Sequence, residues 1–123
     1  MAILRPTAQA VSQAIWSVFA KGKAMPHPLA VGLFRLPENA LAERRRRARM
    51  EIALRANREG YALLDTFDTS GPQHGQDDAL NAVRVLTEHH DIHAVLLLGD
   101  LDQAKVDDLV VEHSLITLRV AEA

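Results

Sequence analysis

Apolar and polar positions follow two different periods along this chain. Longer stretches repeat apolar residues every three or four positions, which is typical of amphipathic helices that bury one face. Short apolar runs between them have the length and composition of buried strands. The predicted strands are residues 29–36, 61–67, 93–99 and 114–120, and the predicted helices are residues 40–59, 77–90 and 100–113.

Strands that alternate with helices favour parallel pairing through right-handed crossovers. We therefore expect an α/β domain of three layers, with a mainly parallel four-stranded sheet in the order 2-1-3-4 and helices on both faces. Ligands of such sheets bind at the carboxyl ends of the strands. Residues 35–39, 68–75 and 99–103 should meet at that edge, together with the last few residues of the chain.

Several residues predict where these elements begin and end. Asn39 is the candidate N-cap of the long helix, and Gly60 stands at the position after its end. Residues 69–76 are predicted to be a loop because they are rich in glycine, proline and serine. Arg45 and Arg49 lie beside the apolar arc of the long helix, so their side chains should extend over the edge of the sheet.

Residues 1–28 are predicted to form an amphipathic helix, over residues 7–21, and a proline-containing linker before the α/β domain of residues 29–123. The apolar face of the helix has to be buried against some other surface. Docking on its own domain and association with a second copy or another protein both remain open. This face consists of Val11, Ile15, Val18 and Phe19.

Composition narrows the classes of function. The formal net charge is −2, which argues against a general attraction to nucleic acid or to a membrane surface. The chain has no cysteine, so disulfides and thiolate metal sites are excluded. No apolar run reaches the roughly 18–20 residues that a membrane span needs. We expect a cytoplasmic protein without a membrane partner, and no residue pattern indicates a small-molecule substrate.

Three stretches of the sequence together are similar to a known family. They are VGLFRLPEN (31–39), REGYALLDTFDTSG (58–71) and HAVLLLGDLDQAKVDDLV (93–110). In spacing and order they resemble the catalytic domain of the serine recombinases, the resolvases and invertases. The resemblance covers about residues 29–120.

The resemblance implies that the catalytic residues of that family are largely replaced. Arg35 matches the arginine of the first strand, but Pro37 stands at the nucleophilic serine and Asp77 near the loop arginine. Asp102 matches the aspartate of the catalytic turn, whereas Gln103 stands at the arginine beside it. Proline has no hydroxyl with which to form a phosphoseryl link, and phosphoryl transfer needs a cluster of cations. We therefore expect a protein that is not an enzyme and needs no cofactor.

An arginine-rich stretch offers a second hypothesis, a DNA-associated accessory protein. Four arginines of the long helix gather on one side, where they could contact phosphates. The alternative is a solvated face with local ion pairs such as Glu51–Arg55. The four are Arg44, Arg47, Arg55 and Arg58.

A third hypothesis is a Mg²⁺-dependent phosphoryl-transfer enzyme. Glu38 with the Asp100-Leu101-Asp102 triplet is similar to the Toprim domain of topoisomerases and primases, where carboxylates hold Mg²⁺. Glutamates of that domain usually precede a glycine, whereas Asn39 follows Glu38 here. Acidic residues are also common at helix N-termini. The leading hypothesis remains a non-catalytic, resolvase-like interaction or regulatory module that self-associates or binds another protein through its N-terminal helix.

Overall fold

The computed structural model describes residues 27–122, except for the side chains of Gln73 and His74. The predicted N-terminal helix, with its apolar face, lies outside these residues. The elements follow the predicted alternation of strands and helices. They are β1 (Leu29–Arg35), α2 (Ala42–Arg58), β2 (Ala62–Asp68), α3 (Gln73–His89), β3 (Ile92–Gly99), α4 (Gln103–His113) and β4 (Ile116–Arg119).

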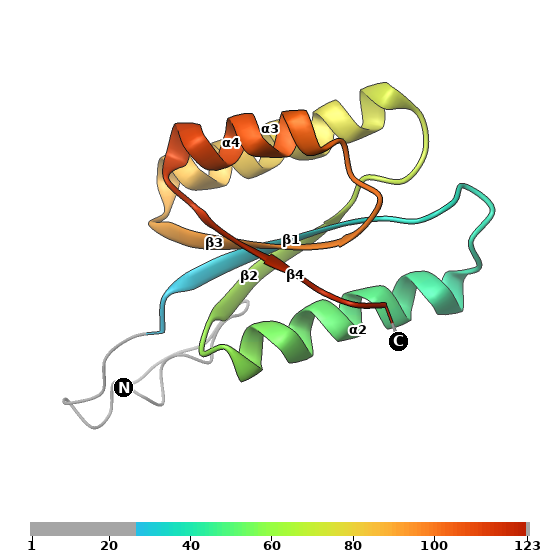
Figure 1. Ribbon diagram of the computed structural model, residues 1–123, viewed down its shortest axis with the longest axis horizontal. Coiled ribbons are helices and arrows are strands. Elements are labelled where there is room, and N and C mark those ends of the chain that lie inside the picture. The colour runs from blue at the N-terminus through green and yellow to red at the C-terminus, as the bar shows by residue number, and fades with distance from the viewer. Residues whose placement is uncertain (1–26, 123) are drawn as a thin grey trace.

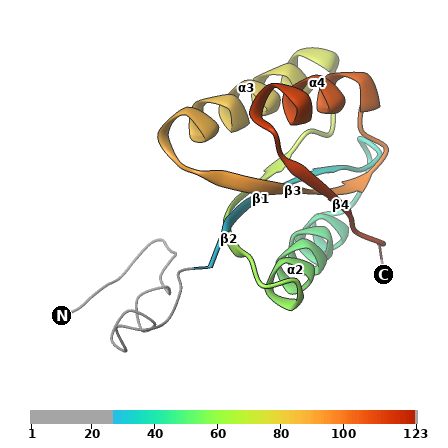
Figure 2. The same cartoon turned by 60° about the vertical axis from the view of Figure 1, so that its left-hand side comes forward.

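The strands form one four-stranded sheet in the order β2-β1-β3-β4, and all three pairings are parallel. Helix α2 covers one face of the sheet, and α3 and α4 lie together on the other (Figures 1 and 2). The prediction of a three-layer α/β domain in this strand order is confirmed. None of the helices described is both long and apolar enough to cross a lipid bilayer.

The apolar core consists of two clusters, one on each face of the sheet. Side chains of a strand point alternately to its two faces, so Val31 and Leu33 of β1 face α3 and α4, whereas Ala30 and Phe34 face α2. Strand β3 contributes in the same alternating way. The inner strands are therefore buried on both faces, which explains why their sequences are continuously apolar.

The long helix begins later than the sequence predicts. Its N-cap is Leu41, which makes no side-chain capping bond. Asn39 lies instead in a turn closed by the hydrogen bond from the Ala40 N–H to the Pro37 carbonyl, at 2.9 Å. The prediction for the other end is confirmed, because Gly60 follows the helix with a φ of 84°. A left-handed residue at this position commonly ends a helix.

Helix α3 begins at Gln73, four residues before the predicted start at Asp77. Part of the predicted loop is thus helical. Pro72 takes the N-cap position in an extended conformation. Gln76, in the first turn, is buried, and its side-chain carbonyl accepts a hydrogen bond from the Asp102 N–H at 3.2 Å. This contact joins distant parts of the chain, so local composition could not reveal it.

The close approach of β3 to the end of β1 predicts that Gly99 is intolerant of a side chain. Gly99 has a φ of 93°, and an added Cβ would lie 2.0 Å from the Arg35 carbonyl oxygen. We expect Gly99→Ala to reduce the free energy of unfolding by about 3 kcal/mol or more, because a backbone clash adds to left-handed strain. Urea denaturation measures this loss.

Gly60→Ala is the matched control. Gly60 also has a positive φ, of 84°, but an added Cβ would find no atom within 4 Å. We expect it to cost about 1 kcal/mol, from the conformational strain alone. Equal losses in the two variants would contradict the packing argument at Gly99.

Candidate functional site

The carboxyl ends of β1 and β3 frame a cleft where ligands of this fold class commonly bind. The chain leaves β1 through α2 on one face, toward β2, and leaves β3 through α4 on the other face, toward β4, so the connections diverge between the adjacent strands β1 and β3. The cleft has a volume of about 330 Å³. This switch-point cleft is lined by Arg35, Leu36, Pro37, Glu38, Arg44, Gly71, Gly99, Asp100 and Glu122.

Arg35, at the end of β1, is bound to the segment that follows β2. Its Nη1 and Nη2 groups donate to the carbonyl oxygens of Thr69, at 2.6 Å, and Gly71, at 3.0 Å. The Ser70 hydroxyl of the same segment accepts the Leu36 N–H at 2.9 Å. These bonds turn the guanidinium toward backbone oxygens. One N–H group of each terminal nitrogen therefore holds the loop.

The three carboxylates of the predicted Mg²⁺ site are not brought together. Glu38 and Asp100 line the switch-point cleft, but Asp102 does not. Asp102 is the N-cap of α4, where its carboxylate accepts the Lys105 N–H. Among residues 27–122, no group of three or more His, Asp or Glu side chains is placed to hold a metal ion. The geometry gives no support to the magnesium hypothesis.

The positions carried over from the recombinase resemblance are also divided. Arg35 and Pro37 share the switch-point cleft, and Pro37 is exposed. Asp77 lines a separate cleft between α3 and α4, where its carboxylate pairs with the Lys105 ammonium at 2.5 Å. Gln103, on the surface of α4, donates to Asp107. Of the positions carried over from the resemblance, Arg35 alone thus brings a cation to the cleft beside Pro37.

Asp68, at the end of β2, was not singled out in the sequence. Its carboxylate accepts hydrogen bonds from the Ser70 N–H, at 2.8 Å, and from Arg45, at 2.7 Å. Burial alone raises the pKa of this carboxyl group, but the bonds from Ser70 and the charge and bond of Arg45 outweigh it, so the net pKa is lowered. The Asp-x-Ser spacing is a local signal for such a turn. The predicted extension of Arg45 over the sheet edge is confirmed.

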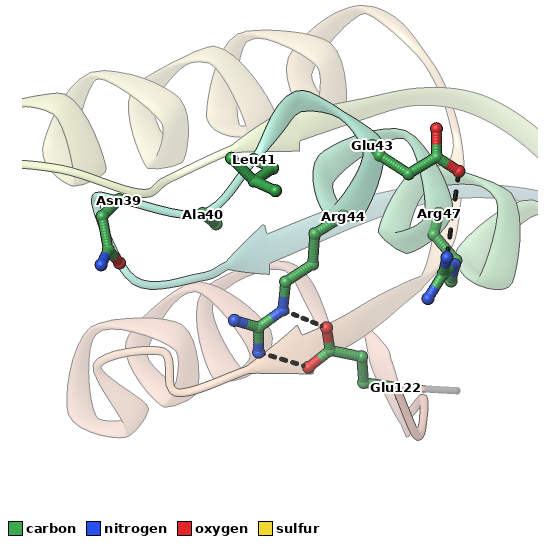
Figure 3. Close-up of a pocket in the computed structure, with 7 residues that line it drawn as sticks. All are labelled: Asn39, Ala40, Leu41, Glu43, Arg44, Arg47 and Glu122. Carbon is green, nitrogen blue, oxygen red and sulfur yellow. Dashed lines mark hydrogen bonds and ion pairs between the residues drawn. The ribbon is translucent and has the colours of Figure 1, made fainter.

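A second concave surface lies where α2 begins (Figure 3). Arg44 Nε and Nη2 donate to the two carboxylate oxygens of Glu122, at 2.5 and 2.9 Å. The bond from Arg44 is the main reason that the pKa of Glu122 lies below its ordinary value. The last few residues were expected at the carboxyl edge of the sheet, but Glu122 itself was not named as a site residue. This Arg44 pocket is lined by Asn39, Ala40, Leu41, Glu43, Arg44, Arg47 and Glu122.

Most arginines of α2 have partners within the domain. Arg47 lies 3.9 Å from Glu43, and Arg55 pairs with Glu59 at 2.9 Å, not with Glu51 as predicted. Arg49 donates to a backbone carbonyl of β2 and lies over the ring of a core phenylalanine. Of the four arginines predicted to contact phosphates, only Arg58 makes no ion pair within the described range. The structure therefore favours the local-pair interpretation of this helix.

The lowered pKa of Asp68 predicts a pH dependence of stability. The ionised carboxyl stabilises the fold above its ordinary pKa of 3.8, and this contribution is lost as the pH falls through the lower pKa of the folded state. We expect Asp68→Asn to cost about 1 kcal/mol near neutral pH. The difference from the parent protein should shrink at about pH 3.

Urea denaturation at the two pH values measures the effect, with Asp91→Asn as control. Asp91 has an exposed carboxylate on the surface, so its removal should change stability little at either pH. A constant difference between Asp68→Asn and the parent protein across this range would show that the charge of Asp68 is not what stabilises the turn.

The chain was compared with protein families, with curated proteins and with solved structures. No family, no curated protein and no solved structure matches it.

Proposed function

We propose that this protein is a non-catalytic, resolvase-like interaction module that self-associates through residues 7–21. The main support for the absence of catalysis is that Arg35 donates hydrogen bonds to the backbone carbonyls of Thr69 and Gly71. These two charge-assisted bonds hold the guanidinium against the backbone of the loop, which is a structural use of the side chain. An exposed proline at position 37 supplies no nucleophile beside it.

An incompletely covered sheet face supports the association part of the proposal. Helix α2 packs against β1, β2 and β3. At the neighbouring strand β4, Leu118 packs on the α2 side of the core, and Ile116, two residues earlier, points to the same side. Ile116 remains 54% exposed. This apolar surface is available to a partner segment, and the apolar face of residues 7–21 has matching chemistry.

The decisive experiment measures the mass of the full chain in solution by light scattering at several concentrations. We expect the parent protein to form a dimer or larger oligomer. Ile15→Asp should shift it to monomer, because a carboxylate in an apolar interface is left without a partner. Gln13→Asp introduces the same charge on the opposite side of the predicted helix and should leave the mass unchanged.

Two results would contradict this proposal. A parent protein that remains monomeric at all concentrations has no self-association to explain. Equal dissociation by Ile15→Asp and Gln13→Asp would show that added charge, not the apolar face, breaks the contact.

The role assigned to Arg35 makes a separate prediction about stability. Arg35→Ala removes two charged hydrogen bonds from a half-buried position, and we expect the free energy of unfolding to fall by about 2 kcal/mol. Arg58→Ala, at an exposed position of α2, should change it by less than about 0.5 kcal/mol. Thermal and urea denaturation measure both. Unchanged stability of Arg35→Ala would remove the main support for a structural role.

A further inference from the structure

The start of α2 combines several features that attract an anion. Its N-cap, Leu41, provides no side-chain acceptor for the first N–H groups of the helix. The dipole of this 17-residue helix places partial positive charge at the same end. Arg44 and Arg47, one turn apart, both line the Arg44 pocket. Helix N-termini supplemented by arginine are suited to phosphate and carboxylate groups.

A carboxylate of the chain itself already lies in this pocket. Glu122 presents both oxygens to the planar fork of Arg44, as Figure 3 shows. The charge of Arg47 contributes to the lowered pKa of Glu122, so the second guanidinium also acts on the bound carboxylate. The contact is therefore direct evidence of how the pocket holds a group with two coplanar, negatively charged oxygens.

The acidic residue in the wall of the pocket is neutralised by another arginine. Both carboxylate oxygens of Glu43 accept bonds from Arg46, at 2.7 Å each. Arg47 is farther from Glu43, at 3.9 Å. With Glu43 paired in this way, Arg44 and Arg47 provide a net positive charge once Glu122 moves away.

We propose that the Arg44 pocket is a binding site for a phosphate group and that Glu122 occupies it in competition with that ligand. A phosphate offers the same pair of oxygens to Arg44, and it carries a further oxygen and more negative charge for Arg47 and the helix N-terminus to attract. The pair of Arg44 and Glu122 is half-buried, with 43% and 30% of the two side chains accessible. Water still reaches both groups, so a free anion can compete with Glu122 for Arg44. This site does not depend on self-association.

The test compares the binding of inorganic phosphate to the full chain and to Glu122→Gln, by NMR titration of the backbone amides of Ala42 and Glu43. We expect Glu122→Gln to bind about two- to sixfold more tightly, the factor that corresponds to losing a solvent-accessible ion pair as competitor. Adding Arg44→Ala to Glu122→Gln should abolish the gain. Glu112→Gln is the matched control.

Glu112 pairs with Arg84 on the other face of the domain, at 3.3 Å, so its removal changes the net charge equally without opening the pocket. A second titration with a short DNA duplex identifies the source of the phosphate. If Glu122→Gln binds inorganic phosphate more tightly than the parent chain does, but not the duplex, the ligand is a phosphomonoester. If it binds both more tightly, the ligand is a nucleic-acid backbone. The proposal fails if Glu122→Gln binds no better than Glu112→Gln, or if the gain survives Arg44→Ala.

Discussion

The hydrogen bonds from Arg35 to the carbonyls of Thr69 and Gly71 are the constraint on which the carboxyl edge of the sheet depends. Strand β1 lies between β2 and β3, so whatever fixes its end also fixes the ends of its neighbours. On one side Arg35 holds the segment that follows β2. On the other side its own carbonyl lies so close to Gly99 that no side chain fits there. The path of the chain around the switch-point cleft follows from these two contacts.

This use of Arg35 shows how a position that resembles a catalytic one can serve the fold. A cation in a phosphoryl-transfer site has to direct its N–H groups at the reacting phosphate. Arg35 directs two of its N–H groups at backbone oxygens, and the other positions of the resemblance are spread between different clefts. Fold does not determine function, so the function has to be argued from the groups that remain accessible. In this domain those groups are apolar residues at β4 and the arginines at the start of α2.

The sequence predicted the fold more completely than the site, because the two depend on contacts of different range. Strands and helices follow from periodicity, and the parallel pairing of the strands follows from their alternation. The early start of α3 was missed because its first turn is rich in residues typical of loops, and the bond from Asp102 to Gln76 in that turn joins positions 26 residues apart. Arg35 and Pro37 were correctly expected at the carboxyl edge. The last few residues were expected there too, but the pairing of Glu122 with Arg44 was not, since 78 residues separate the two and no local pattern marks the pair.

The arginines of α2 show why a count of charges does not measure a binding surface. Arg45 bonds to Asp68, and Arg49 bonds to the Thr66 carbonyl, so both attach the helix to the edge strand β2. Because the Thr66 carbonyl is already bonded and arginine charges lie beside it, β2 is also less able to pair with a strand of another molecule. Arg46 and Arg55 are paired with glutamates one turn away. Only arginines without such partners can act on an external anion. At the start of α2, the position of one carboxylate, Glu122, decides whether Arg44 is among them.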